Sequence, residues 1–304
     1  MLMEITHLQS INDAISQMSP GDILVLNDGI YHEKVEIWLD NITIRAKNIG
    51  KAIITNKDYY HKIMPDKNEC NTFHTYTVYV GGNHIHLEGL LLQNEAIPSN
   101  VYGQAVALHV DGNHFQCEHC IIESAQDTLF TGPLPEDLCK RYASFYPPEK
   151  LKGISSKQIY KHCTIKGDVD FIFGCATALF EECTIITIDS NRTTPSFVCA
   201  PAHPKELPFG YLFYHCQFKG KEKAFLARPW RDYGCAAFIE CELGDHILPK
   251  GYDKWNDTHR DQTARFYEYT KNKDVSQRVS WSHQLSSVEA KTYIINFKTF
   301  LEKK

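Results

Sequence analysis

Polar side chains in four separate stretches of the sequence could together perform covalent or acid–base catalysis. The stretches supply two carboxylates, Asp127 and Asp170, and one cation, Arg228. Two carboxylates that lie close together titrate as a coupled pair, one ionised and one protonated, as a nucleophile and a general acid require. A guanidinium can hold the ionised partner in a fork. Side-chain amides from Gln104 and Gln126 could donate hydrogen bonds to a developing oxyanion.

Each of these residues also has an ordinary structural interpretation when it is taken alone. Asp170 lies in the short apolar run Gly167–Gly174, which predicts a buried strand bounded by glycines. A buried carboxylate must be paired with a cation or face a cleft, and in such a run it is more often a turn or salt-bridge residue. A Gln that starts a strand is commonly a turn residue, and an Arg-Pro-Trp such as Arg228 to Trp230 is commonly packing. Only the combination points to a site.

A recurring four-residue strand signal indicates how these distant residues are brought together. In each copy a polar residue precedes Cys and an apolar residue follows two positions later, so the Cys and that residue share one face. The copies are His119–Ile122, His162–Ile165, Glu182–Ile185, His215–Phe218 and Glu240–Leu243. Such repetition is typical of a solenoid, whose turns bury their faces by stacking about 4.8 Å apart. We therefore expect an all-β parallel β-helix with the cysteines in its interior; a β-sandwich is the alternative.

The solenoid, a single domain over residues 1–304, needs elements that cover its ends. A short capping helix is predicted at about residues 7–18. The tail, about residues 260–304, has no further Cys signal and includes a predicted helix near Ser287–Tyr293 that packs back on the coils. The Pro- and aromatic-rich segment 132–153 interrupts the strand pattern. It predicts an excursion loop, and such loops are usually functional or disordered.

The composition places the chain among soluble globular proteins. Its 304 residues are 43% hydrophobic and 23% charged, and the net charge of −5 argues against nucleic acid or an anionic membrane as the main partner. No apolar run reaches the length of about 18 residues that suggests a membrane span. The start, Met1 to His7, lacks the basic residues and long apolar core of a secretory signal. We expect a cytoplasmic protein, with a secreted chain that has lost its signal as the alternative.

Eleven cysteines are many for this length, but they do not indicate a metal site. The number is odd, and free thiols in a cytosolic protein behave as small buried apolar residues. Cys117 and Cys120 form the one Cys-x-x-Cys pair, and no second pair or His pair stands at the spacing of a zinc site. We expect no bound metal.

The four stretches, in their order along the chain, resemble those of the pectin methylesterases. They are Gln104–Leu108, Gln126–Phe130, Gly167–Gly174 and Leu226–Trp230. Weaker blocks of similarity are Gly82–Asn94, Phe209–Phe218 and Leu243–Asn256, and the resemblance runs from about Ile5 to the end. It implies a right-handed parallel β-helix. It also implies hydrolysis of the methyl esters of galacturonate units, in pectin or oligogalacturonides, to carboxylate and methanol through a covalent acyl-aspartyl intermediate.

The resemblance assigns a role to each of the five polar residues. Asp170 is expected to be the nucleophile that attacks the ester carbonyl. Asp127 is expected to protonate the departing methanol and then to activate water. The amides of Gln104 and Gln126 are expected to stabilise the oxyanion, and Arg228 to hold and orient the nucleophile.

Aromatic residues in the fourth stretch and in the block Leu243–Asn256 are candidates for contact with the sugar rings. The resemblance implies that Trp230 lines the sugar subsites, with Tyr252 and Trp255 as further candidates. The expected partner is a methyl-esterified oligogalacturonide or pectin. Neither a metal nor an organic cofactor is expected, because an activated carboxylate supplies covalent catalysis.

The sequence departs from the family pattern at several positions. Phe130 stands where the family usually has Tyr, Ala227 where Gly is usual, Cys175 at a position often Asn, and Tyr252 at a position often Trp. None of these changes removes a catalytic group. The excursion loop 132–153 is longer than in plant-type members, so we expect an altered rim of the cleft. Because no secretory signal is visible, short intracellular oligogalacturonides are the more economical substrate.

Three other functions share parts of this pattern. Another carboxyl-ester or thioester hydrolase on the same scaffold would retain the same catalytic residues. A glycosidase or lyase on the same fold could use Asp127 and Asp170 differently, since a glycosidase also needs two carboxylates. A non-catalytic carbohydrate-binding solenoid is the third alternative. The two glutamines and the arginine favour acyl transfer.

Overall fold

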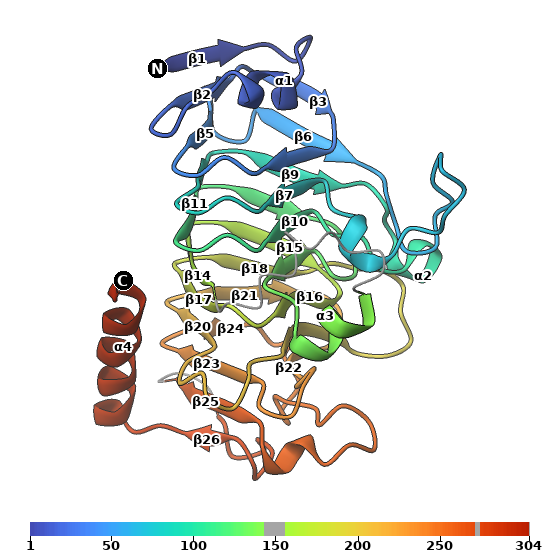
Figure 1. Cartoon of the computed structure of the whole chain (residues 1–304). Helices are drawn as coiled ribbons and strands as arrows, with labels where there is room; N and C mark the ends of the chain where they lie inside the picture. Colours follow the sequence, from blue (N-terminus) through green and yellow to red (C-terminus); the bar gives the residue numbers. More distant parts are fainter. Residues whose placement is uncertain (143–155, 271–273, 304) are drawn as a thin grey trace.

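The chain winds into a coil of short parallel strands that form three sheets (Figure 1). The computed structural model describes residues 1–142, 156–270 and 274–303. The strands of each sheet come from successive turns, and their pairings within these residues are parallel, as between β13 and β16. This arrangement confirms the predicted parallel β-helix and not the β-sandwich, whose sheets are antiparallel.

Three sheets, called A, B and C here, run along the coil within the described residues. Sheet A contains β1 (Leu2–Ile5), β2 (Ile23–Leu26), β5 (Thr43–Ala46), β8 (His86–Glu88), β11 (Phe115–Glu118), β14 (Lys157–Lys161), β17 (Thr177–Glu181), β20 (Tyr211–Tyr214), β23 (Cys235–Ile239), β25 (Arg265–Tyr269) and β26 (His283–Gln284). Sheet B contains β3 (Gly29–His32), β6 (Ala52–Asn56), β9 (Leu91–Asn94), β12 (Ile121–Glu123), β15 (Thr164–Gly167), β18 (Thr184–Thr187), β21 (Gln217–Gly220) and β24 (Glu242–Leu243). Sheet C contains β4 (Val35–Ile37), β7 (Val78–Val80), β10 (Leu108–Val110), β13 (Leu129–Thr131), β16 (Val169–Gly174), β19 (Ser196–Pro201) and β22 (Ala224–Ala227).

Aromatic rings stack along the interior face of sheet A. Tyr160, Phe180, Phe213 and Phe238 occupy matching positions in β14, β17, β20 and β23. Their ring centroids are 4.8, 4.6 and 4.9 Å apart, and successive planes differ by 10°, 11° and 4°. Because neighbouring strands are also about 4.8 Å apart, each ring covers the one below it without a gap. The stack holds successive turns in register.

The Cys signal marks the corner between sheets A and B. The residue before each Cys has a positive φ of 52–54° (His119, His162, Glu182, His215 and Glu240), which turns the chain sharply. The cysteines that follow are at most 8% exposed (Cys120, Cys163, Cys183, Cys216 and Cys241) and belong to the core. The thiol of Cys216, for example, donates to the Phe180 carbonyl oxygen at 3.2 Å. The prediction that these cysteines lie in the interior is confirmed.

A short helix, α1 (Ile11–Ser16), covers the N-terminal end of the coil. Its Ile11, Ala14 and Ile15 are buried, and the Ser10 side chain caps it by accepting from the backbone N–H of Asp13. The helix is shorter than the predicted range 7–18. Its first N–H groups donate to the Glu33 carboxylate, which fixes where it begins.

The C-terminal tail contains more regular structure than the sequence indicated. It includes η3 (Arg260–Gln262), the strands β25 and β26, and the helix α4 (Ser287–Glu302). Ser286 and Glu289 form a capping box at the start of α4. Its buried Ala290, Phe297 and Leu301 pack on the outer side of sheet A, against residues such as Leu212 (Figure 1). The predicted packed helix is present and continues to Glu302. None of the helices described is long and apolar enough to cross a membrane.

Several excursions leave the coil beside sheet C, and some of them carry short helices. They contain η1 (Thr72–His74), α2 (Ser99–Tyr102) and α3 (Glu136–Tyr142). Figure 1 shows α2 and α3 on the side of the coil away from α4. The predicted excursion at 132–153 is observed as far as Tyr142, and the remainder of it lies outside the described residues.

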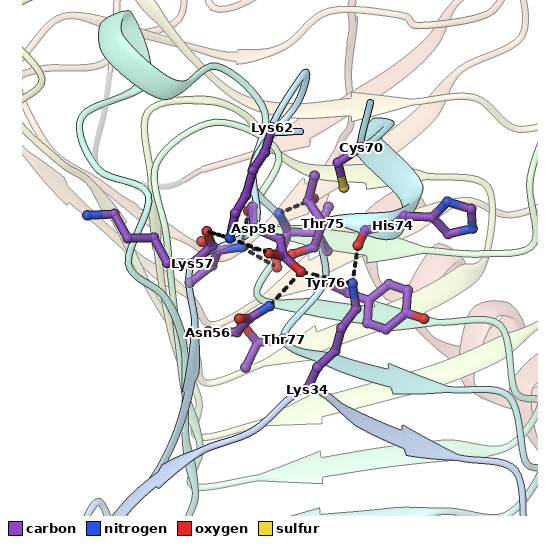
Figure 2. A network of polar contacts seen from close by, with 12 residues as sticks. Lys34, Asn56, Lys57, Asp58, Lys62, Cys70, His74, Thr75, Tyr76 and Thr77 are labelled. Carbon is purple, nitrogen blue, oxygen red and sulfur yellow. Dashed lines mark hydrogen bonds and ion pairs between the residues drawn. The ribbon is translucent and has the colours of Figure 1, made fainter. Parts of the chain in front are cut away.

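A cluster of charged side chains around the buried Asp58 anchors the excursion that contains η1 (Figure 2). The carboxylate of Asp58 accepts from Lys62 Nζ at 2.8 Å, Lys34 Nζ at 3.1 Å and Asn56 Nδ2 at 3.0 Å. Burial opposes ionisation of Asp58, but the hydrogen bonds from Lys62 and Asn56 and the charge of Lys34 together lower its pKa. Lys34 Nζ also donates to the His74 carbonyl oxygen. The cluster therefore ties η1 to the strands of the coil.

Candidate active site

A local irregularity in β16 turns Asp170 out of the coil. Val169 pairs with Phe197 and Ile172 with Cys199, so the register between β16 and β19 shifts within this strand. Asp170 has a φ of 50°, in the left-handed region. A bulge of this kind inserts one extra residue and redirects a side chain. The carboxylate of Asp170 consequently lines an open cleft while the ring of Phe171 lies in the core.

Arg228 holds the Asp170 carboxylate in a two-point contact. Its Nε donates to Oδ1 at 2.8 Å and its Nη2 to Oδ2 at 2.6 Å. The guanidinium itself lies between two aromatic faces, 3.8 Å from the ring centre of Phe197 and 4.0 Å from that of Trp255. Such contacts attract the cation and fix its plane. The orientation of the Asp170 carboxylate is thus determined by a side chain that is itself fixed.

Asp127 lies beside Asp170 at the entry to β13. It has a φ of 64°, and its backbone N–H donates to the carbonyl oxygen of Val169 at 3.0 Å. This bond connects the Asp127 turn to the strand that carries Asp170. Both carboxyl groups are less than 10% exposed and line the same cleft. The geometry brings the two predicted carboxylates together.

The two carboxyl groups differ in their electrostatic surroundings. Burial, followed by the charge of Asp170, raises the pKa of Asp127 well above its usual value. Burial also raises the pKa of Asp170, but the hydrogen bonds and charge of Arg228 oppose this effect. Because Arg228 contacts Asp170 directly, Asp170 is the group that ionises first. The pair therefore provides one carboxylate and one carboxylic acid.

Gln104 and Gln126 lie side by side at the same cleft. Their backbones form an isolated parallel bridge, and Ala105 N–H donates to the Gln126 carbonyl oxygen at 3.0 Å. Both side chains line the cleft with Asp127 and Asp170. Two amide donors next to a carboxylate are suited to stabilise an oxyanion that develops there.

Two of the three predicted aromatic residues line the cleft. Trp230 packs edge-on against Phe173, with ring centres 5.7 Å apart, and Trp255 lies against Arg228. Tyr252 does not belong to the cleft, which corrects the expectation that it contacts sugar. Its backbone forms a bridge with Ala227 and its side chain is 1% exposed.

Tyr252 instead completes the core near the C-terminal end of the coil. Its hydroxyl donates to Glu268 Oε2 at 3.2 Å, and its ring stacks on that of Phe266. Glu268 also forms a buried ion pair with Arg278. The tyrosine therefore has a structural role at this position.

Several cleft residues were not identified from the sequence. The cleft encloses about 550 Å³ and is also lined by Thr72, Phe73, Asp137, Leu138, Arg141, Arg231 and Arg260. The guanidinium of Arg231 binds the Asp137 carboxylate of α3 at 2.7 and 3.0 Å. Arg231 directly follows the Arg-Pro-Trp stretch, and α3 lies in the predicted excursion loop. Those two signals could have found part of this wall, whereas nothing in the sequence marked Thr72 and Phe73.

The departures from the family pattern do not alter the polar groups of the cleft. Phe130 is fully buried in an apolar cluster with Phe73 and Phe173. Ala227 lies in the core, and the thiol of Cys175 donates to the carbonyl oxygen of Pro133 at 2.5 Å. These side chains belong to the packing around the cleft and add no polar group to it.

The described residues do not form a metal site at the cleft or elsewhere. Within them, no group of three or more His, Cys, Asp or Glu side chains is arranged to hold a metal ion. Cys117 and Cys120, the pair in Cys-x-x-Cys spacing, are buried in the core.

Comparison with known proteins finds pectinesterases among the relatives of this chain. "Probable pectinesterase 8" of Arabidopsis thaliana is 28% identical over 300 residues, which cover 93% of this chain and 69% of the relative. Pectinesterase 2 of Citrus sinensis is 26% identical over 299 residues, covering 92% and 53%. The chain therefore spans between about half and two thirds of the length of these relatives.

Solved structures support the fold. Pectin methylesterase PemA from Erwinia chrysanthemi superposes with a TM-score of 0.79 at 20% identity, covering 96% of this chain and 94% of the other. A pectin methylesterase in complex with a hexasaccharide gives a TM-score of 0.77 at 20% identity, with 94% and 91% coverage. The sequence model of the pectinesterase family matches residues 4–134 and 148–303. The chain belongs to the pectinesterase family.

Proposed function

We propose that this protein hydrolyses the methyl esters of galacturonate units to carboxylate and methanol by an acyl-aspartyl mechanism. One observation carries the proposal. Asp170, held at two points by Arg228, shares a cleft with a second carboxyl group, Asp127, whose pKa is raised well above its usual value by burial and by Asp170. This pair has the two protonation states that nucleophilic attack and leaving-group protonation need.

The first half of the proposed reaction transfers the acyl group to the enzyme. An Asp170 carboxylate oxygen bonds to the ester carbonyl carbon, and the carbonyl oxygen becomes an oxyanion that accepts hydrogen bonds from the Gln104 and Gln126 amides. The bond from that carbon to the methoxy oxygen then breaks. Asp127 gives its proton to this oxygen, so methanol leaves, Asp127 becomes a carboxylate and an anhydride joins Asp170 to the substrate.

The second half restores the enzyme. Water loses a proton to Asp127 and its oxygen bonds to the same carbonyl carbon, with the same two amides facing the oxyanion. The anhydride bond breaks, Asp170 leaves as a carboxylate that Arg228 receives, and the product carboxylic acid ionises in solution. Asp127 is again protonated and Asp170 again ionised, as before the reaction.

The cleft suits an acidic carbohydrate. Arg141, Arg231 and Arg260 line it in addition to the Arg228 that holds Asp170. Arg231 is already paired with Asp137. Guanidinium groups bind carboxylates, so Arg141 and Arg260 favour a chain in which some galacturonate units are unesterified. Trp230 and Trp255 offer aromatic faces to the pyranose rings. The hexasaccharide complex of a related solved enzyme supports an oligosaccharide ligand.

The size of the preferred substrate is part of the proposal. Leu138 and Arg141 of α3 form one wall of the cleft, and Thr72 and Phe73 contribute from the excursion that contains η1. These two excursions shape the rim of the cleft, and we propose that the protein uses short methylated oligogalacturonides in preference to long pectin chains.

Methanol release from polymeric pectin and from short methylated oligogalacturonides tests the function directly. We expect methanol from both, with a higher kcat/KM on the oligomers. An enzyme that hydrolysed other carboxyl esters or thioesters and released no methanol from either substrate would contradict the proposal. Equal or better use of the polymer would contradict only the size preference.

We also propose that the protein works in a reducing compartment such as the cytoplasm. All eleven cysteines are free thiols, and ten of them are buried. Buried thiols without disulfides are usual where glutathione keeps cysteine reduced. Subcellular fractionation with an antibody against the protein checks this proposal, and recovery in the extracellular fraction would contradict it.

A further inference from the structure

A third carboxyl group, that of Asp168, lies close to the pair formed by Asp127 and Asp170. It precedes the nucleophile by two positions and is 0% exposed. Its backbone is fixed on two sides: its N–H donates to the Ala125 carbonyl oxygen at 3.0 Å, and its carbonyl accepts from Phe197 N–H at 3.1 Å. A fully buried carboxyl group is unfavourable unless its oxygens are satisfied, so its partners indicate what it does.

Both oxygens of Asp168 accept hydrogen bonds from uncharged donors. The backbone N–H of Val169 donates to Oδ1 at 2.6 Å, and the hydroxyl of Ser99 donates to Oδ2. Both oxygens are thus satisfied. Neither donor carries a charge that would offset the charge of Asp168.

The bond with Ser99 connects Asp168 to the oxyanion side of the cleft. Ser99 starts α2, and the chain passes from α2 directly to Gln104. Ser99 is itself 95% buried, so the contact is shielded from water. Asp168 therefore fixes the segment that presents the Gln104 amide.

The charge of Asp168 acts on the carboxyl groups of Asp127 and Asp170. It opposes ionisation of both Asp127 and Asp170, in addition to burial. Arg228 acts in the opposite direction on both groups, and Arg192 does so on Asp170. Of the three aspartates, Asp168 alone forms or breaks no bond and transfers no proton in the proposed reaction.

We propose that Asp168 is a positioning residue of the reaction, which fixes the Gln104 segment through Ser99 and keeps a negative charge beside the Asp127–Asp170 pair. The inference rests on the proposed esterase function. It assigns to Asp168 two separable effects, one through a hydrogen bond and one through charge. Two substitutions distinguish them.

Asp168→Asn removes the charge and keeps an oxygen that can accept a hydrogen bond. Loss of a nearby negative charge makes Asp127 and Asp170 easier to ionise, so both limbs of the kcat–pH profile should move to lower pH. A neighbouring unit charge of the same sign typically raises a carboxyl pKa by about one unit or more, so its removal predicts a shift on the order of one pH unit. Ser99→Ala keeps the charge and removes the hydroxyl, so kcat should fall several-fold while both limbs stay in place.

The profiles are measured on methylated oligogalacturonide after wild-type methanol release has been established. A wild-type enzyme without methanol release contradicts the esterase function itself. An active wild type whose profile superposes on that of Asp168→Asn overturns the inference alone. If Asp168→Asn does not fold, Asp168→Glu keeps the charge and displaces it. Its limbs should then stay in place while kcat falls, and a shift of about one pH unit would overturn the inference.

Discussion

The contact between Arg228 and Asp170 fixes the orientation of the buried carboxyl group that we propose as the nucleophile. Asp170→Asn is nearly isosteric and can still accept a hydrogen bond from the guanidinium, but an amide cannot form the anhydride. We expect kcat to fall by at least about 10³-fold. When catalytic groups act as a unit, removal of one of them abolishes most of the rate enhancement. Methanol release and circular dichroism check this outcome. A folded variant with substantial hydrolysis would mean that another group is the nucleophile.

Gln126 is expected to act in the transition state and not in substrate binding. Its side chain lines the cleft beside both aspartates. Removal of one oxyanion donor lowers kcat by about 10²-fold or more, so Gln126→Ala should do so with little change in KM. Steady-state kinetics on methylated oligogalacturonide measure both constants, with Gln104→Ala as the matched comparison. A change confined to KM would place the amide on the sugar and not on the oxyanion.

The different surroundings of Asp127 and Asp170 predict a bell-shaped dependence of kcat on pH. Activity requires Asp170 ionised, so it rises as pH increases through the pKa of this group. It also requires Asp127 protonated, and because burial and Asp170 raise the pKa of Asp127, activity is lost only when pH rises through that higher value. A profile with one limb only, measured in buffers of constant ionic strength, would contradict the assignment of Asp127 as the acid.

At the scale of elements, the excursions build the cleft walls, and sheet C with the turns at the ends of its strands carries the proposed catalytic residues. The Asp58 cluster anchors the η1 excursion, which supplies Thr72 and Phe73. Asp58→Asn leaves Lys34 and Lys62 without their carboxylate. We expect a loss of about 1–3 kcal/mol of stability, below the cost of breaking a fully buried pair because both lysines are partly exposed. The cleft wall should loosen, so KM should rise.

The pH dependence of that loss provides its test. The pKa of Asp58 is lowered in the folded state, so its contribution is present above the unfolded value of about 3.9 and disappears as pH falls through the folded value. Urea unfolding of wild type and Asp58→Asn at neutral pH and near pH 3 measures it. The difference between the two proteins should shrink at low pH. A constant difference would mean that packing and not charge accounts for the loss.

Some elements were predictable because their signals are local. The Cys signal marks the corner that precedes a sheet B strand. The residue before each Cys adopts a positive φ and the Cys then points inward. This pattern depends on adjacent residues only. The helix α4 was predicted near Ser287–Tyr293, and the capping box that starts it lies within four consecutive residues. The strands β25 and β26 lack the Cys signal, so the sequence left them within an undivided tail.

Other features depend on contacts between residues far apart in the chain. The exit of Asp170 from the coil follows from the register shift between β16 and β19, which the alternation within one strand cannot reveal. Tyr252 was misassigned because its position is set by the bridge to Ala227, which places its side chain inside. The buried Asp168 has its partner Ser99 on α2, 69 positions away. Spacing along a sequence carries no information about such pairs.

At the scale of the whole molecule, stability comes from turns that stack on their neighbours. Phe213 lies in the middle of the ring stack, against Phe180 on one side and Phe238 on the other. Phe213→Ala opens a cavity that touches two interfaces between turns, and large-to-small core changes of this kind cost about 3–5 kcal/mol. Val288→Ala, at a 74% exposed position of α4, should change stability by less than about 0.5 kcal/mol.

Urea unfolding followed by circular dichroism compares the two variants, and methanol release is measured on the same samples below the transition. Because Phe213 lies in sheet A and the cleft is on sheet C, the kcat of folded Phe213→Ala should remain within a few-fold of wild type. In a solenoid each turn contacts mainly its neighbours, so a weakened interface also favours unfolding of part of the coil and a broader transition. Loss of activity without loss of stability would show that the ring stack positions the catalytic strand, which a nearest-neighbour solenoid does not predict.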